Sequence, residues 1–192
     1  MENPQQAGDR IYDALLHGKK KEEVVFDVIQ NNNYEKRMLI SQYYKSAYTN
    51  TLFDDIKSIG GDFSYAASLM FLNPLEFCIK LLVKAVDKKD NSWIFELLSS
   101  KTLDEIKLIE DVYQKEYDKS LRDGLDKIFS GVMKKNVLNF LTTKRNQDHN
   151  PKKNECESNA TTLIDAGESN WVNDENIFKE IFLKKSPEEL IL

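Results

Sequence analysis

The amino-acid sequence predicts an all-helical protein in which one structural unit is repeated. Apolar residues recur at three- and four-residue spacing along most of the chain, which is the period of an amphipathic helix. The 192 residues include only 7 Gly and 4 Pro, and this scarcity favours long helices with short connections over a turn-rich β fold. The same succession of apolar segments appears twice, at an offset of roughly 70 residues, which is typical of an internal repeat.

Five helical segments are expected in the first unit. Apolar spacing predicts the first four over residues 11–16, 24–29, 38–48 and 52–59. Gly60-Gly61 is typical of a helix end, because glycine readily adopts the left-handed conformation found there. Asp62 follows directly and is placed to cap a fifth helix over residues 63–72.

The second unit follows the order of the first. Helices are predicted from Pro74 to about Val86, and then over residues 93–98, 102–117, 121–128 and 133–141. Tyr113 and Tyr117 fall where Tyr44 and Tyr48 fall in the first unit. These four tyrosines have helical spacing and no catalytic neighbour, so we expect them in the core.

A third unit begins after a polar segment. Residues 144–158 are rich in Asn and Lys and contain Pro151, a composition typical of a linker. Helical runs then follow over 161–166 and 177–183, and a partial unit of this kind must either pack on the others or stay poorly ordered. The expected organisation is an N-terminal tail (1–8), a first repeat (9–72), a second repeat (73–143), a linker (144–158) and a partial third repeat (159–192).

Composition and motifs narrow the function classes. The formal charge of −5 argues against a nucleic-acid-binding protein, which needs a basic face. The polar N-terminus MENPQQAGDR and the lack of a run of about 18 apolar residues predict a cytoplasmic protein whose membrane contact is peripheral. Cys78 and Cys156 lack metal-ligand spacing, and we expect reduced thiols with Cys78 on a buried helical face. No catalytic motif is present and His17 is far from His149 in sequence, so an enzyme is not expected.

Three segments resemble the annexin family. Residues 37–63, RMLISQYYKSAYTNTLFDDIKSIGGDF, are similar to the annexin run in which spaced tyrosines lead into a "DLIDDLKSELSGNF"-type helix. Pro74-Leu75-Glu76-Phe77 resembles the "PPAEFDA" junction that opens the second annexin repeat. LIDAGESNWVNDE, residues 163–175, resembles the third-repeat pattern "LYEAGELKWGTDEE". The resemblance implies an all-α, annexin-like array of five-helix repeats that forms a curved disc and binds acidic phospholipid membranes through calcium on its convex side.

The resemblance also implies where calcium ligands belong. In annexins, carbonyl oxygens of a K-G-x-G-T turn and a carboxylate about forty residues later complete the six to eight oxygens that calcium takes. The candidate metal positions in this chain are Gly18, Gly61, Asp62, Ser64, Asn173 and Asp174.

This chain departs from that pattern in every unit. His17 and Lys19 are expected at the two glycine positions of the first turn, and Ser64 at the acid position. The second turn, residues 87–90, is short, and Lys134 stands at its acid position, while Val172 replaces the loop glycine of the third unit. An ammonium group cannot coordinate a cation, so we expect high-affinity calcium binding to be lost.

Basic residues gather at the same loops. The resemblance places Lys19, Lys20, Lys21, Lys88, Lys89, Lys134 and Lys135 on the membrane-facing side. Lysine near an anionic leaflet contributes roughly 1 kcal/mol, which favours docking without calcium, although such residues can equally serve only to solubilise the loops. Trp171 has two interpretations as well, because its ring can enter the lipid interface or pack on the partial third unit.

Two functions remain from different classes. The leading hypothesis is an annexin-like peripheral phospholipid-binding protein with degenerate calcium loops. The alternative is a helical-repeat scaffold for a protein partner, for example a cytoskeletal one, which should expose an apolar patch. A truncated gene product is a further expectation that fits the incomplete third unit.

Overall fold

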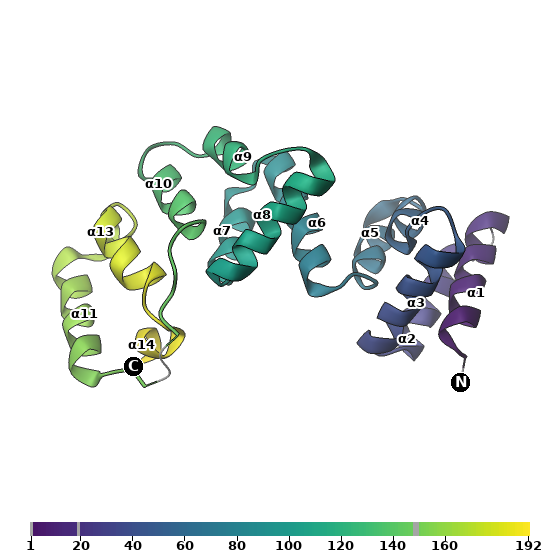
Figure 1. Ribbon diagram of the computed structural model, residues 1–192, viewed down its shortest axis with the longest axis horizontal. Coiled ribbons are helices and arrows are strands. Elements are labelled where there is room, and N and C mark those ends of the chain that lie inside the picture. Colours follow the sequence, from purple (N-terminus) through teal and green to yellow (C-terminus); the bar gives the residue numbers. More distant parts are fainter. Residues whose placement is uncertain (1, 19, 148–149) are drawn as a thin grey trace. The chain divides into compact units, whose positions relative to one another are not determined.

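The computed structural model describes residues 2–18, 20–147 and 150–192, and within these ranges it contains helices and no strand (Figure 1). The predicted all-α class is therefore confirmed. In chain order the helices are α1 (Pro4–His17), α2 (Lys21–Asn31), α3 (Tyr34–Ala47), α4 (Leu52–Lys57), α5 (Gly61–Leu69), α6 (Pro74–Lys88), α7 (Asn91–Ser99), α8 (Leu103–Tyr117), α9 (Leu121–Ile128), α10 (Gly131–Phe140), α11 (Lys153–Ala166), α12 (Glu168–Trp171), α13 (Glu175–Ile177), the π-helical turn η1 (Phe178–Leu183) and α14 (Pro187–Ile191).

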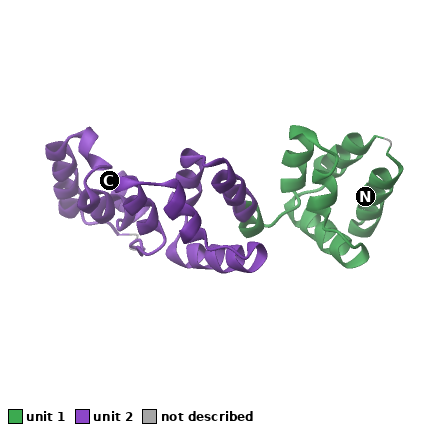
Figure 2. Ribbon diagram, turned by 90° about the horizontal axis from the view of Figure 1, so that it is seen from above, with its two compact units in different colours: residues 1–77 green, residues 78–192 purple. Residues whose placement is uncertain are grey.

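The chain divides into two compact units (Figure 2). Unit 1 is residues 1–77 and contains α1 to α5, and unit 2 is residues 78–192 and contains α7 to α14. The division falls inside α6, a few residues beyond the repeat boundary expected after residue 72. The boundaries of the repeats themselves stay a prediction of the sequence.

Unit 1 buries one face of each helix in a common core. The buried residues are Ala7 and Ile11 of α1, Val25 and Val28 of α2, Ile40 and Tyr44 of α3, Leu52 and Ile56 of α4, and Ala67 of α5 with Phe71 after it. Full burial of an Ile or Leu side chain contributes about 1.5–3 kcal/mol, so this core stabilises the five-helix arrangement. Tyr44 is fully buried and its hydroxyl donates to Asp55 Oδ2 at 2.7 Å, which confirms its predicted place in the core.

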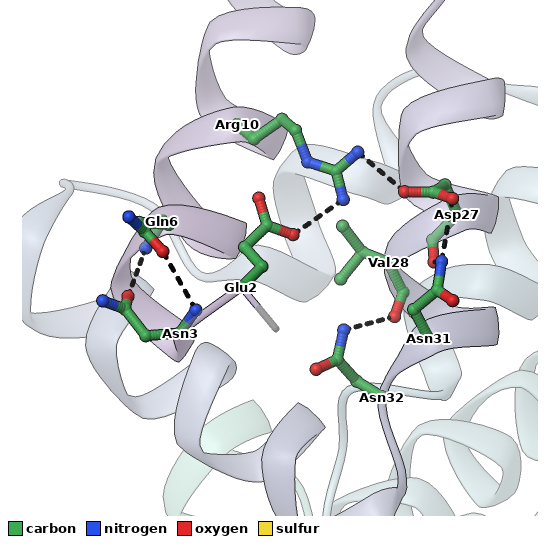
Figure 3. Close-up of polar contacts among 8 residues, drawn as sticks. All are labelled: Glu2, Asn3, Gln6, Arg10, Asp27, Val28, Asn31 and Asn32. Atoms are coloured by element: carbon green, nitrogen blue, oxygen red, sulfur yellow. Dashed lines mark hydrogen bonds and ion pairs between the residues drawn. The ribbon is translucent and has the colours of Figure 1, made fainter.

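Ion pairs and hydrogen bonds connect α1 to the helices beside it. Arg10 donates from Nη1 to Asp27 Oδ2 at 2.7 Å and from Nη2 to Glu2 Oε2 at 2.8 Å, which joins α1 to α2 (Figure 3). The hydroxyls of Tyr43, in α3, and of Tyr48, which caps the C-terminal end of α3, both donate to Asp9 Oδ1, at 2.7 and 2.5 Å. These two bonds hold the pKa of the Asp9 carboxyl below its usual value.

Arg37 fixes the relative direction of α2 and α5. Its Nε donates to the carbonyl of Met70, which caps α5, at 2.9 Å, and its Nη1 donates to the carbonyl of Asn32, which caps α2, at 2.7 Å. The C-terminal ends of both helices therefore meet at one guanidinium group. The turns that precede α2 and α5 accordingly lie at the other end of the pair.

In unit 2 the segment after residue 159 packs on α7 and α10, which is one of the two outcomes expected for a partial repeat. Phe95 of α7 and Phe140 of α10 have ring centroids 5.0 Å apart, and Phe178 of η1 lies 6.0 and 6.1 Å from them. Asn136 of α10 donates to the carbonyl of Val172 at 2.7 Å. The partial third repeat thus completes its core by packing on an apolar face of the second repeat.

Two local expectations are wrong. Asp62 does not cap α5, because α5 begins at Gly61, Gly60 is its N-cap, and no side chain bonds that end. Both glycines adopt positive φ, 90° and 80°, and the helix begins two residues earlier than a cap at Asp62 would place it. Asp62 instead lies in the first turn, where a carboxylate is favoured by the helix dipole.

The predicted linker is shorter than expected, because α11 begins at Lys153 and residues 153–158 are helical. Ion pairs at helical spacing, Lys152–Glu155 at 3.0 Å and Lys153–Glu157 at 3.7 Å, support this polar first turn. Cys156 is buried in this helix, although the composition of the segment resembles that of a linker. Cys78 is buried and free as well, which confirms its predicted place on a buried face.

Candidate calcium-binding and membrane-contact loops

The first loop joins α1 to α2 through two left-handed residues. Gly18 caps α1 with φ 75°, and Lys20 precedes α2 with φ 56°. His17, which stands where the resemblance expects the first glycine of the turn, is the last helical residue of α1. Lys19 lies outside the described residues. The conformation that favours glycine is thus adopted by a lysine at position 20, at a cost of about 1 kcal/mol or somewhat more.

The expected acid position of unit 1 does not supply a ligand. Ser64 is fully buried, and its Oγ has no hydrogen-bond partner among the described atoms. A buried neutral hydroxyl cannot replace an exposed carboxylate at a calcium site. Asp62 and Gly61 are exposed at the N-terminal end of α5, the same end of the α2–α5 pair as Gly18 and Lys20. The structure therefore brings these candidates to one end of unit 1 with Asp62 as the carboxylate.

The second loop is a tight helix-ending turn. The N–H of Asp90 donates to the carbonyl of Ala85 at 2.9 Å, and the N–H of Lys89 donates to that of Val86 at 3.1 Å, which together form a Schellman motif. Lys89 occupies the left-handed position with φ 54°. Asp90 Oδ1 accepts from the N–H of Trp93 at 3.1 Å and so serves as the cap of α7.

In unit 2, a lysine stands at the position where the resemblance expects the calcium-binding carboxylate. The Nζ atom of Lys134, in α10, lies 2.6 Å from Asp126 Oδ1, in α9. Sequence reasoning identified Lys134 but missed Asp126, because the two residues are separated by a turn and share no helical spacing. The ammonium group of this lysine neutralises a carboxylate that would otherwise attract a divalent cation.

The third loop uses its polar groups internally. Asn173 Nδ2 donates to the carbonyl of Ser169 at 2.7 Å. Asp174 Oδ1 accepts from the N–H groups of Asn176 and Ile177 at 2.9 and 3.1 Å, which makes it the cap of α13. A carboxylate that already caps a helix is less available as a calcium ligand.

Trp171 is half-buried in unit 2. Its Nε1 donates to the carbonyl of Leu163 at 2.8 Å, and its ring lies 6.0 Å from that of Phe182. Of the two interpretations of Trp171, this arrangement favours packing on the partial third repeat over insertion into lipid.

Several of the loop lysines have acidic partners. Lys20 Nζ lies 3.0 Å from Glu23 Oε2, and Lys135 Nζ lies 3.0 Å from Glu175 Oε2. Lys88 and Lys89 are exposed, whereas Lys21 is half-buried. Exposed ion pairs contribute only about 0–1 kcal/mol, so such lysines can exchange one anionic partner for another.

The donor set does not fit a calcium ion. Across residues 2–18, 20–147 and 150–192, no group of three or more His, Cys, Asp or Glu side chains is placed to hold a metal. Carbonyl-rich loops can bind calcium with one carboxylate, but here Ser64 is buried, Lys134 is cationic and Asp174 is a cap, which leaves Asp62 as the one exposed carboxylate among the candidate residues. The loss of high-affinity calcium binding stays a prediction of the sequence.

A cavity of about 560 Å³ lies in unit 2 between the α7–α8 turn, residues 144–147 and α14. Its lining combines Lys101, Lys144 and Arg145 with Asp104 and Glu188, and contains neither His nor Cys. Arg145 donates to the carbonyls of Lys185 and Phe182 at 2.8 and 2.9 Å, so its guanidinium holds the chain together.

Comparisons with known proteins agree with the fold and the repeat. The sequence model of the annexin family matches residues 79–140. Human annexin A13 is 31% identical over 172 residues, which are 88% of this chain and 54% of that protein. A solved structure of annexin III covers 97% of this chain with a TM-score of 0.80 and 26% identity. The chain belongs to the annexin family.

Other annexins give the same picture. Mouse annexin A3 is 27% identical over 99% of this chain, and a chicken annexin V structure solved with Zn²⁺ has a TM-score of 0.78 at 25% identity. A calcium-bound annexin (Sm)1, at 18% identity and a TM-score of 0.73, shares the fold. The chain spans 54% of the length of annexin A13 and 60% of that of annexin A3. Among the helices described in this annexin, none is both long and apolar enough to cross a membrane.

Proposed function

We propose that this annexin binds peripherally to acidic phospholipid surfaces through loop lysines and with little dependence on calcium. The observation that carries the proposal is the identity of the left-handed residues in its first two loops. Lys20 and Lys89 adopt the conformation that favours glycine and place a cationic side chain in each turn. No catalytic activity is proposed for the chain.

Electrostatics sets the expected strength. Lys21, Lys88 and Lys89 would each contribute about 1 kcal/mol near an anionic leaflet, or about 3 kcal/mol together, which corresponds to a dissociation constant of about 6 mM. Lys20, Lys134 and Lys135 contribute less, because carboxylates already neutralise them. Such binding requires densely charged membranes and weakens with salt, since the Debye length is only ~10 Å at 0.1 M.

Vesicle co-sedimentation tests the proposal. Phosphatidylserine-rich vesicles at low ionic strength are expected to pellet the protein equally in EGTA and in millimolar calcium. Phosphatidylcholine vesicles should pellet none of it, and about 0.5 M salt should release it, because the Debye length then falls to roughly 4 Å.

Matched charge variants separate the loops from general basicity. The pair Lys88→Glu, Lys89→Glu should weaken pelleting at least tenfold. The pair Lys107→Glu, Lys115→Glu makes the same change of charge at exposed positions of α8 and should leave pelleting nearly unchanged. Equal losses in the two variants would contradict loop-specific docking. Strict dependence on calcium would contradict its mechanism, and failure to bind under any condition would favour the protein scaffold instead.

A further inference from the structure

The cavity of about 560 Å³ in unit 2 has the size and the lining of a small-molecule site. It lies between the α7–α8 turn, residues 144–147 and α14, and its walls expose more apolar than polar surface. Sites for small molecules typically have volumes of about 300–1,000 Å³ and are mostly apolar, with a few polar groups that orient the ligand. The residues around the cavity therefore indicate the chemistry of its ligand.

Two helices supply apolar side chains to the cavity. Leu103 is the first residue of α8, and Pro187 is the first residue of α14. Leu190 follows one helical turn after Pro187 and is 42% exposed, so part of its side chain is available to a ligand. Covering apolar surface is favourable by about 25 cal/mol per Å², which favours a ligand with a hydrocarbon body.

Two lysines from different segments line the same cavity. Lys101 lies in the α7–α8 turn, and Lys144 follows α10. Neither ammonium group forms an ion pair with another residue in the part of the chain that the structure describes. The charge of Lys101 acts on Glu105, but that carboxylate accepts from the N–H and the hydroxyl of Thr102 at 2.8 and 2.9 Å and serves the cap of α8. Because Lys101 is half-buried without an ion pair, it favours an anionic ligand.

The N-terminal end of α8 adds to this preference. Thr102 caps the 15-residue helix by accepting from the N–H of Glu105 at 3.3 Å. The N–H groups of Leu103 and Asp104 belong to the first turn, where an α-helix provides no partner for them, and both residues line the cavity. Such N–H groups and the helix dipole together attract negative charge.

The charged side chains of the lining limit the ligand to a single negative charge. Two carboxylates and three cationic groups line the cavity, from Asp104, Glu188, Lys101, Lys144 and Arg145. Arg145 already donates to two backbone carbonyls, at 2.8 and 2.9 Å, which leaves the two lysines for a ligand. A second anionic group would meet the carboxylates, and a cationic ligand would meet the lysines. A monoanion is therefore the best match.

We propose that this cavity binds a small amphiphilic monoanion, such as an alkyl carboxylate. Its head group lies between Lys101, Lys144 and the N-terminal end of α8, and its hydrocarbon body lies against the apolar side chains of α8 and α14. The site is separate from the proposed membrane contact, because the α7–α8 turn follows the C-terminal end of α7 whereas the Lys88-Lys89 loop precedes its N-terminal end.

Isothermal titration calorimetry of the wild-type chain with octanoate, below its critical micelle concentration, tests the proposal. One molecule is expected to bind per chain, and a parallel titration with octyl sulfate identifies whether a carboxylate or a sulfate head group is preferred. Octanol lacks the charge and acetate lacks the hydrocarbon body, so each is expected to bind at least tenfold more weakly. Octanoate should also raise the melting temperature, because it binds the folded chain and not the unfolded one.

Matched charge variants locate the head group. The pair Lys101→Gln, Lys144→Gln should weaken octanoate binding at least tenfold. The pair Lys107→Gln, Lys115→Gln makes the same change of charge at exposed positions of α8 and should leave binding nearly unchanged. Circular dichroism and thermal melting establish that both double variants are folded. Equal losses of binding in the two pairs would overturn the proposal.

A second pair of variants tests the hydrocarbon contact. Leu190→Asp should weaken octanoate binding at least tenfold, whereas Leu108→Asp, at a 49% exposed position of α8, should bind like the wild type. Failure of both octanoate and octyl sulfate to bind, or equal binding of octanol, would overturn the proposal. So would a lowered melting temperature with many molecules bound per chain, because that result indicates detergent action. No vesicle is used, so the membrane proposal stands or fails separately.

Discussion

Lys134 and Asp126 form a 2.6 Å ion pair across the turn between α9 and α10, at the position where the family resemblance expects a carboxylate. The side chains are 35% and 49% exposed, so the pair contributes at most about 1 kcal/mol to stability. Its larger effect is on charge, because an ammonium group satisfies the carboxylate that would otherwise favour a cation.

Replacing Lys134 by Glu should create a response to calcium. Two carboxylates would then face each other across the turn, and their repulsion should lower stability in EGTA by about 1 kcal/mol. Millimolar calcium should restore part of that loss by bridging them. Thermal melting with and without calcium measures the effect. Lys134→Gln removes the ion pair without adding a carboxylate and should show no calcium response; equal behaviour of the two variants would contradict this explanation.

The left-handed lysine in the second loop should be replaceable with a gain in stability. Lys89 has φ 54° at the end of α6, where glycine carries no steric cost. Lys89→Gly should therefore stabilise unit 2 by about 1 kcal/mol. Lys88→Gly, one residue earlier and still helical, should instead destabilise it by about 0.5–1 kcal/mol. Urea unfolding of both variants measures the difference, and effects of the same sign would refute the assigned turn.

The lowered pKa of Asp9 predicts how the stability of the fold changes at acidic pH. Its carboxylate accepts hydrogen bonds from Tyr48 and Tyr43, which lower its pKa in the folded state. A depressed pKa stabilises the fold above the unfolded value of about 3.9, and that contribution is lost as pH falls through the lower folded value. Asp9→Asn should be less stable than the wild type near pH 6, with the difference shrinking below pH 4. Unfolding at several pH values tests this, and a constant difference would show that the carboxylate charge plays no part.

The sequence predicts the helices and core of this annexin well because both follow from local periodicity. Tyr44 could be assigned to the core from its spacing alone, and it is fully buried. The sites were harder, because their geometry depends on the backbone between helices. The amino-acid sequence does not reveal that Lys20 and Lys89 adopt left-handed conformations, because that prediction requires knowing where the adjacent helices begin and end. The Lys134–Asp126 pair depends on how α10 folds back on α9, which spacing along the chain does not encode.

Trp171 provides a direct test of which side chains reach a membrane. The chain has two tryptophans, and Trp93→Phe leaves Trp171 as the single indole. Trp171 donates to the carbonyl of Leu163 and packs beside Phe182, and breaking that hydrogen bond costs about 1 kcal/mol. We therefore expect its emission to stay unchanged on phosphatidylserine vesicles, without quenching by brominated lipid.

The reciprocal variant Trp171→Phe keeps the 44% exposed Trp93 and reports whether α7 approaches lipid. Quenching of Trp171 at vesicle concentrations that bind the protein would mean that the indole leaves its packed position, and membrane contact would then include this residue as well as the loop lysines.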